Sequence, residues 1–150
     1  MACVLCKRNP TAHSFKYFGK TTDGTSLYYT APAQATARDD AQSLCTLRTH
    51  LAEVEKPWIW VLDCTGMQIQ NQFTMQFSVA FADMLVAEHA SFLRRIIIIH
   101  PNPWIYRVLH ILSQEIKDCV QYANRPIELV RATTNFTYEA KTWLRLAVKS

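Results

Sequence analysis

Residues 58–66 read Trp-Ile-Trp-Val-Leu-Asp-Cys-Thr-Gly, and this stretch decides the fold. The apolar run at 58–62 ends in an Asp-x-x-Gly turn signal at 63–66. A second apolar run, Ile-Ile-Ile-Ile at 96–99, ends before His-Pro-Asn-Pro at 100–103. Continuous apolar runs of this length are typical of strands buried on both faces of a sheet, as in parallel sheets covered by helices. The two runs therefore predict an α/β fold.

Strand and helix signals alternate on both sides of these runs. Strands are predicted by β-branched and aromatic runs, which occupy residues 14–19, 26–30, 58–62, 95–100 and 127–131. Helices are predicted by apolar residues at helical spacing, which cover residues 36–55, 69–90, 103–121 and 136–148. An Asp-Gly pair at 23–24 predicts that the first two strands form a hairpin. The expected architecture is a mixed, mainly parallel sheet covered by helices, with right-handed crossovers.

Composition limits the number of domains and the kinds of partner. The chain has 150 residues, 49% hydrophobic and 19% charged, which is typical of a single globular domain. We expect residues 1–13 to form an N-terminal tail and residues 14–150 to form the domain. The net charge of +4 would tolerate an anionic partner, but the basic residues are scattered. Without a basic stripe, we expect no nucleic-acid partner.

The five cysteines indicate the compartment. Their odd number and irregular spacing favour a reducing environment. The N-terminal residues lack the pattern of a signal peptide, and no apolar run approaches the roughly 18–20 residues of a membrane span. We therefore expect a cytoplasmic protein that can also associate peripherally with membranes.

Asp63 is the first candidate for chemistry, because ligand sites of open α/β sheets lie where strands end. It could be a phosphotransfer nucleophile, but Thr65 stands where a second carboxylate is usual. The alternative is an Asp that caps the following turn, and we favour it.

Cysteine and histidine give weaker signals. Cys3-x-x-Cys6 with His13 has some metal-ligand spacing, but a structural zinc site needs four ligands. Among the dispersed histidines, His100 at a strand end is the most site-like, although an ordinary hydrogen bond explains it better. With no nucleophile elbow and only three glycines, we expect no enzyme activity, no metal and no cofactor.

The helices at 69–90 and 103–121 carry apolar residues over more than one stripe. Such helices are either sandwiched between layers or line an apolar cavity. The pattern alone leaves both possibilities open.

The order of these motifs resembles the CRAL-TRIO lipid-binding domain family over about residues 15–131. The residues that carry the resemblance are the hairpin at 18–29, the strand and Asp-x-x-Gly at 60–66, the run at 96–104, and Arg-Pro-Ile-Glu-Leu-Val at 125–130. Ser91 stands where phosphatidylinositol-binding members have a Glu that helps to hold the inositol headgroup. The resemblance therefore implies a lipid domain without a clear signal for inositides.

The resemblance implies a non-enzymatic lipid-binding or lipid-transfer module, with an apolar pocket between the sheet and the helices at 69–90 and 103–121. The expected acyl-chain contacts are Phe73, Phe77, Phe81, Trp104, Val108, Ile111 and Leu112. The residues expected to attract headgroups or the membrane surface are Arg94, Arg95 and Arg125. The ligand would be a phospholipid or another hydrophobic molecule.

The alternative is a protein-interaction scaffold on the same fold, with a filled pocket. Divergent relatives of the family bind small GTPases or their regulators, so a protein partner or a homodimer is also open. An exposed apolar patch would favour this alternative.

Overall fold

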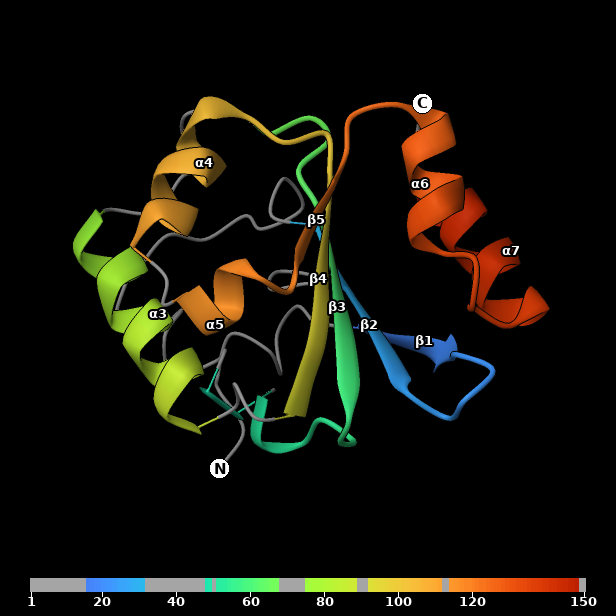
Figure 1. The fold of residues 1–150 in the computed structure, drawn as a ribbon, viewed down its shortest axis with the longest axis horizontal. Coiled ribbons are helices and arrows are strands. Elements are labelled where there is room, and N and C mark those ends of the chain that lie inside the picture. The colour runs from blue at the N-terminus through green and yellow to red at the C-terminus, as the bar shows by residue number, and fades with distance from the viewer. Residues whose placement is uncertain are drawn as a thin grey trace, which may run out of the picture.

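A five-stranded sheet runs through the centre of the computed structural model, with helices on both of its faces (Figure 1). The structure describes residues 16–31, 48–49, 51–67, 75–88, 92–111 and 114–148. The strands are β1 (Lys16–Lys20), β2 (Ser26–Thr30), β3 (Trp58–Asp63), β4 (Leu93–Ile99) and β5 (Val120–Ala123). They lie in the order β1-β2-β3-β4-β5, so that β1 and β5 are the edges.

The sheet is mixed, as expected from the sequence. Strand β1 is antiparallel to β2, and the two are joined by the predicted hairpin. The other neighbours are parallel, and one row of paired residues crosses four strands from Tyr28 through Trp60 and Ile96 to Val120. The row fixes which side chains share a face of the sheet.

Two helical layers cover the sheet (Figure 1). The helices α3 (Met75–Glu88), α4 (Pro103–His110) and α5 (Gln114–Lys117) lie on one face. The helices α6 (Pro126–Ala132) and α7 (Tyr138–Ala147) lie on the other. Residues 48–49 and 51–52 are also helical, and the rest of the helix predicted over 36–55 lies outside the described residues.

The central strands are apolar on both faces, because each face has its own core. In β3, Trp58 and Trp60 join the core beneath α3, α4 and α5, whereas Ile59 and Val61 join the core beneath α6 and α7. The four isoleucines at 96–99 divide between the two cores in the same way. Burial of each such side chain contributes about 1.5–3 kcal/mol. The prediction of doubly buried strands is confirmed.

The helix start predicted after residue 102 is also confirmed. The Asn102 side chain accepts a hydrogen bond from the Ile105 N–H at 2.9 Å, and Pro103 takes the first helical position. Both features satisfy or remove donors that the first turn would leave unpaired.

The predicted end of that helix is wrong. Helix α4 ends at His110, and the segment predicted to continue it to 121 contains α5 and then the beginning of strand β5. Strand β5 has only four residues, and a period of two cannot be distinguished from a period of 3.6 over so short a segment. Its pairing with β4 is a long-range contact that the local pattern does not encode.

The strand predicted at 127–131 is wrong as well, because these residues belong to helix α6. Pro126 occupies the first turn, and the Glu128 side chain accepts from the Arg125 N–H at 3.0 Å in a capping box. Local capping therefore outweighs the β-branched composition of Ile127 and Val130, which are 52% and 61% exposed.

Candidate functional site

A hollow of about 450 Å³ opens at the β5 edge of the sheet, where α4 and α5 meet the outer strand. Its lining residues are Tyr106, Arg107, Leu109 and His110 of α4, Lys117 of α5, and Val120 and Tyr122 of β5. Leu109 is buried and belongs to the core beneath the helices, so the floor of the hollow is continuous with that core. A volume of this size lies in the range of small-ligand sites, about 300–1,000 Å³.

The rim of the hollow is basic. Arg107, His110 and Lys117 line it, and no carboxylate is among the described lining residues. The nearest carboxylate along the chain, Asp118, accepts a hydrogen bond from Gln114 Nε2 at 2.8 Å. Arg107 and His110 lie in the last turn of α4, where the helix dipole also favours cations. Lys117 reaches the hollow from the last turn of α5, so the basic side chains at the rim come from two helices.

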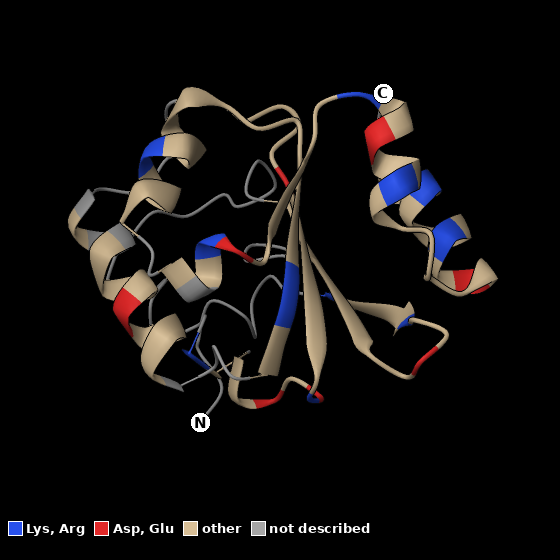
Figure 2. Ribbon diagram, in the orientation of Figure 1, with Lys and Arg blue, Asp and Glu red and all other residues tan. Residues whose placement is uncertain are grey.

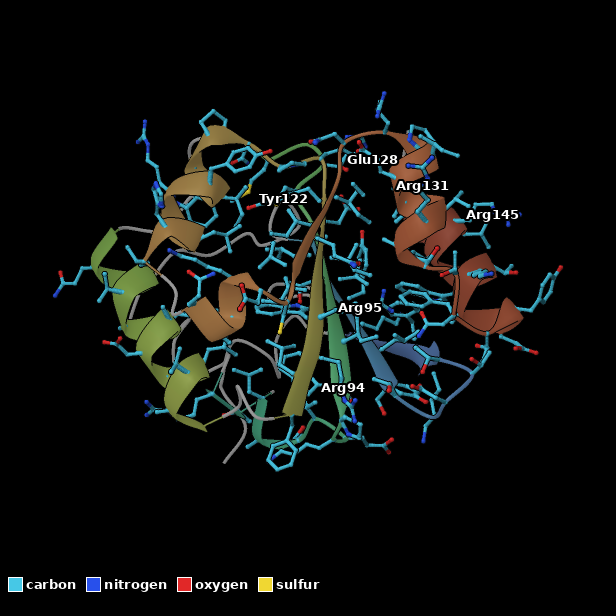
Figure 3. The ribbon with its side chains drawn as sticks, in the orientation of Figure 1. Arg94, Arg95, Tyr122, Glu128, Arg131 and Arg145 are labelled. Carbon is cyan, nitrogen blue, oxygen red and sulfur yellow. The ribbon has the colours of Figure 1, made fainter. Side chains whose placement is uncertain are left out.

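Two tyrosines form the outer wall. The rings of Tyr106 and Tyr122 lie 5.1 Å apart between centroids, and Figure 3 shows Tyr122 on the α4 side of β5. Burial, together with the neighbouring Tyr106, raises the pKa of Tyr122, so its hydroxyl stays protonated at neutral pH. An apolar floor with basic and hydroxyl groups at the rim suits an amphiphilic anion.

Three of the predicted acyl-chain contacts lie in the layer beneath α3 and α4. Phe81, Trp104 and Val108 are partly buried and pack against the core there. The ring of Phe81 meets that of Trp60 edge-on at 5.8 Å. In the structure these side chains contact protein, and their role toward a lipid stays a prediction.

The other predicted contacts are placed differently or lie outside the described part. Ile111 is 39% exposed at the end of α4. Phe73, Leu112 and the side chain of Phe77 fall outside the described residues. The structure therefore brings together three of the seven residues.

The predicted headgroup arginines do not converge on the hollow. Arg95 points to the α6–α7 side, where it donates to the Ala132 carbonyl at 2.8 Å and to Asn135 Oδ1 at 2.7 Å (Figure 3). The adjacent Arg94 is exposed at the lower end of the sheet in that view. Arg125 caps α6 and pairs with Glu128 at 3.2 Å. Their role toward headgroups stays a prediction.

Asp63 has the capping geometry that we favoured over a nucleophile. It is buried, with Oδ1 accepting from the Thr65 N–H at 3.0 Å and Oδ2 accepting from the Tyr29 hydroxyl at 2.6 Å. These bonds hold the turn after β3 and leave the carboxylate facing protein donors.

The other chemical candidates remain apart from one another. His100 is exposed after β4 with a φ of 52°, and His110 lies on the hollow. Cys3, Cys6 and His13 lie outside the described residues. Within the described part, no three His, Cys, Asp or Glu side chains group in a way that could hold a metal ion. No helix found there has the length and apolar character needed to cross a bilayer.

Sequence reasoning missed most of the hollow. On the helix predicted over 103–121 it assigned the acyl-chain contacts to Trp104, Val108, Ile111 and Leu112. In the structure, Tyr106, Arg107, Leu109 and His110 of α4 line the hollow. The i, i+4 spacing of Tyr106 and His110, with Arg107 beside them, was a usable signal on α4. The contribution of β5 was missed, because the predicted helix extended to residue 121 and no strand was predicted over Val120–Ala123.

Comparison with known proteins agrees with this architecture. The model of the divergent CRAL/TRIO domain matches residues 23–138. A solved structure titled "Crystal structure of Sfh5" superposes with a TM-score of 0.54 at 8% sequence identity, covering 73% of this chain and 47% of that chain. At this identity the likeness shows the fold alone, and the chain spans less than half of that structure. No curated protein matches the sequence.

The family match extends over well more than half of the chain, and the chain belongs to the divergent CRAL/TRIO domain family. At the level of the family, this is a fold for binding and transferring lipids, and its members are generally not enzymes.

Proposed function

We propose that this domain is a non-enzymatic module that binds an anionic amphiphile, a lipid with one acidic headgroup, at the hollow between α4, α5 and β5. The observation that carries the proposal is the hollow of about 450 Å³, apolar at its floor and basic at its rim, in a divergent CRAL/TRIO domain. Arg107 and Lys117 would bind the headgroup, and Tyr106 and Tyr122 would donate hydrogen bonds to it.

The acyl chain would continue from Leu109 into the layer beneath α3 and α4, toward Val108 and Trp104. Each CH₂ that leaves water contributes about 0.8 kcal/mol, so that a single chain supplies useful affinity. Because Phe81, Trp104 and Val108 pack against the core in the structure, we expect entry of the chain to require a displacement of α3 relative to α4. A peripheral location at cytoplasmic membranes fits this proposal, since a lipid carrier exchanges its ligand there.

The first experiment is native mass spectrometry of the protein purified from eukaryotic cells, followed by solvent extraction and identification of the lipid. A stoichiometric acidic lipid would support the proposal. A bare protein that also shows no saturable binding of a spin-labelled fatty acid or a lysophospholipid would overturn it.

The site is then tested by charge reversal. The double variant Arg107→Glu, Lys117→Glu should weaken binding of the spin-labelled fatty acid by at least about 10-fold, because it replaces attraction by repulsion at the headgroup. The matched control is Lys141→Glu, Arg145→Glu, which makes the same change of charge on the opposite helical layer. Equal weakening in both variants would show that net charge, rather than the hollow, governs binding.

A further inference from the structure

A second concave surface lies on the other side of the molecule, between α6 and α7. This groove has a volume of about 380 Å³. Its lining residues are Pro126, Leu129 and Val130 of α6, Thr133 at the C-terminal cap of α6, and Lys141, Leu144 and Arg145 of α7. It shares none of its lining residues with the hollow at β5, and the sheet separates the two.

The floor and one wall of the groove are apolar. Leu144 is buried and Leu129 half-buried at the floor. On the α6 wall, Val130 is 61% exposed, although valine is among the residue types most often buried. The groove therefore offers a recessed apolar surface to which another side chain can be added.

The opposite wall is basic. Lys141 and Arg145 lie one helical turn apart on α7, and neither pairs with a carboxylate of the described residues. The helix dipole accounts for a cation at Arg145 in the last turn, but not for Lys141. Figure 3 shows Arg145 on the outer side of this helical layer.

The α6–α7 layer carries a net positive charge. Residues 124–148 carry four Lys or Arg and two Asp or Glu. One of the two acids, Glu128, is engaged by Arg125 and by the Asn124 N–H at 2.6 Å. Figure 2 shows the basic positions distributed along both helices of the layer. The net positive charge of the layer would therefore attract an acidic partner, and the groove would give that partner a place to bind.

We propose that the α6–α7 groove receives an amphipathic acidic helix of a partner protein. Apolar residues of that helix pack on Val130 and the half-buried Leu129, and carboxylates one turn apart pair with Lys141 and Arg145. A helix suits the site because its i, i+4 residues have the same spacing as these two cations, and because a groove between two helices accepts a third. A bilayer surface is a poorer fit, since the apolar floor is recessed between the helices.

The probe is a designed peptide of about four helical turns with Leu at i, i+3 or i+4, and i+7, and Glu one turn apart on the flanking face. We expect isothermal titration to show saturable binding and ¹⁵N NMR to show shifts confined to α6 and α7. A scrambled peptide of the same composition and a peptide with Lys in place of Glu should not bind.

Two variants of the protein separate charge from packing. Lys141→Glu, Arg145→Glu should raise the Kd for the peptide by at least about 10-fold, as should Val130→Glu, a change at an exposed position that does not disturb the core. The matched charge reversal in the hollow, Arg107→Glu, Lys117→Glu, should leave peptide binding within about twofold. Conversely, reversal at Lys141 and Arg145 should leave fatty-acid binding unchanged, so that this inference and the lipid proposal can fail independently.

Three outcomes would overturn the inference. The first is equal binding of the acidic and scrambled peptides, and the second is a set of NMR shifts outside α6 and α7. The third is sedimentation with phosphatidylserine-containing vesicles that depends on Lys141 and Arg145 while the acidic peptide does not bind, which would assign the layer to membrane contact.

Discussion

At the scale of single residues, Asp63 closes the end of the central strand β3. Its two carboxylate oxygens accept hydrogen bonds from different elements. Oδ1 accepts from Thr65 in the following turn, and Oδ2 accepts from the Tyr29 hydroxyl of the neighbouring strand β2. Burial and the hydrogen bond to Asp63 raise the pKa of Tyr29, which keeps the phenol protonated and donating. The carboxylate therefore joins β2, β3 and the following turn.

The variant Asp63→Asn should lower the free energy of unfolding by about 1–3 kcal/mol, because the amide cannot accept from all the same donors. Tyr29→Phe should cost a similar amount, since it leaves Oδ2 without this donor. Urea unfolding of both single variants and the double variant would measure the coupling. Additive losses would contradict a direct interaction between the two side chains.

The thiol of Cys64, beside Asp63, gives a pH-dependent prediction. Burial, and then the charge of Asp63, raise the pKa of Cys64 from 9.0 to about 12. Between these values the unfolded chain has lost the proton and the folded chain keeps it, so stability falls as pH rises above about 9.

We expect the urea midpoint of the reduced protein to fall between pH 8.5 and 10.5, with a slope from this thiol of at most about 1.4 kcal/mol per pH unit. Cys64→Ala should reduce that slope. The lost packing of the side chain also lowers the free energy of unfolding, but by the same amount at every pH, so it does not affect the slope. Cys119→Ala, which removes a half-exposed thiol, is the control and should change the slope less. An unaltered slope in Cys64→Ala would exclude the buried thiol as its source.

Arg95 and Arg94 form a natural pair for comparison. Arg95 binds the Ala132 carbonyl and Asn135 in the turn between α6 and α7, whereas Arg94 is exposed. Arg95→Met should therefore lower the free energy of unfolding by about 1.5–3 kcal/mol, and Arg94→Met by less than about 0.5 kcal/mol.

Arg95→Lys should restore little of this loss, because an ammonium group cannot reproduce the fork that reaches both acceptors. Chemical unfolding of the three variants tests this. Equal stability of Arg95→Met and the wild type would show that the arginine is free for another role, such as the headgroup contact predicted from the sequence.

At the scale of elements, α7 is held against β1 by a close approach of backbones. A Cβ added at Gly19 would lie 3.0 Å from the Ala140 Cβ, and Gly19 has a φ of 143°. The Thr137 N–H also donates to the Lys20 carbonyl at 3.2 Å. Helix α7 and strand β1 can therefore pack this closely because the contact is made by one small residue from each, Ala140 and Gly19.

Gly19→Ala should lower the thermal midpoint more than Gly24→Ala does. Both substitutions place alanine at a positive φ, but Gly24 has open space around it, with a φ of 91°. The difference between the two variants isolates the contact with Ala140 from backbone strain. Thermal unfolding followed by circular dichroism would measure it, and an equal loss in both would mean that α7 shifts freely.

Strand β5 and helix α6 show how neighbouring elements decide each other's structure. Ile96 and His100 donate backbone hydrogen bonds to Cys119 and Ala123, so that β4 draws the segment at 120–123 into the sheet. The chain must then turn at once, and Pro126 with the Glu128 capping box starts a helix there. The strand and the helix therefore appear in the opposite order to the one predicted.

At the scale of the whole molecule, the sheet separates two surfaces with different shapes and the same sign of charge. The hollow at β5 combines Arg107 and Lys117 with an apolar floor, and the groove on the other face combines Lys141 and Arg145 with Val130. One domain could thus hold a lipid and a protein partner at once, without competition for residues.

A ligand at the hollow should stabilise the folded state by mass action. At a free concentration of about 100 times its Kd, a fatty acid should add about 2.7 kcal/mol to the free energy of unfolding. Differential scanning fluorimetry should show the midpoint rising with ligand concentration in the wild type and hardly rising in Lys117→Glu. A rise of the same size in both would place the ligand elsewhere.

The sequence by itself determined the strands that are buried on both faces. The apolar runs at 58–62 and 96–99, the Asp-Gly turn and the Asn102–Pro103 helix start are local signals, and each describes what the structure shows. The quoted motifs and their order were also sufficient to indicate a resemblance to the CRAL-TRIO family, which the family match over residues 23–138 confirms.

Only the tertiary structure decided which elements meet at the candidate site. A four-residue strand such as β5 has too little periodicity to be read locally, and its partner β4 lies about 20 residues earlier in the chain. The placement of Arg95 on the α6–α7 side follows from the pleat, which sends neighbouring side chains to opposite faces. The hollow and the groove depend on such long-range contacts. Each is lined by residues from different elements, and packing of these elements, rather than closeness along the chain, brings the residues together.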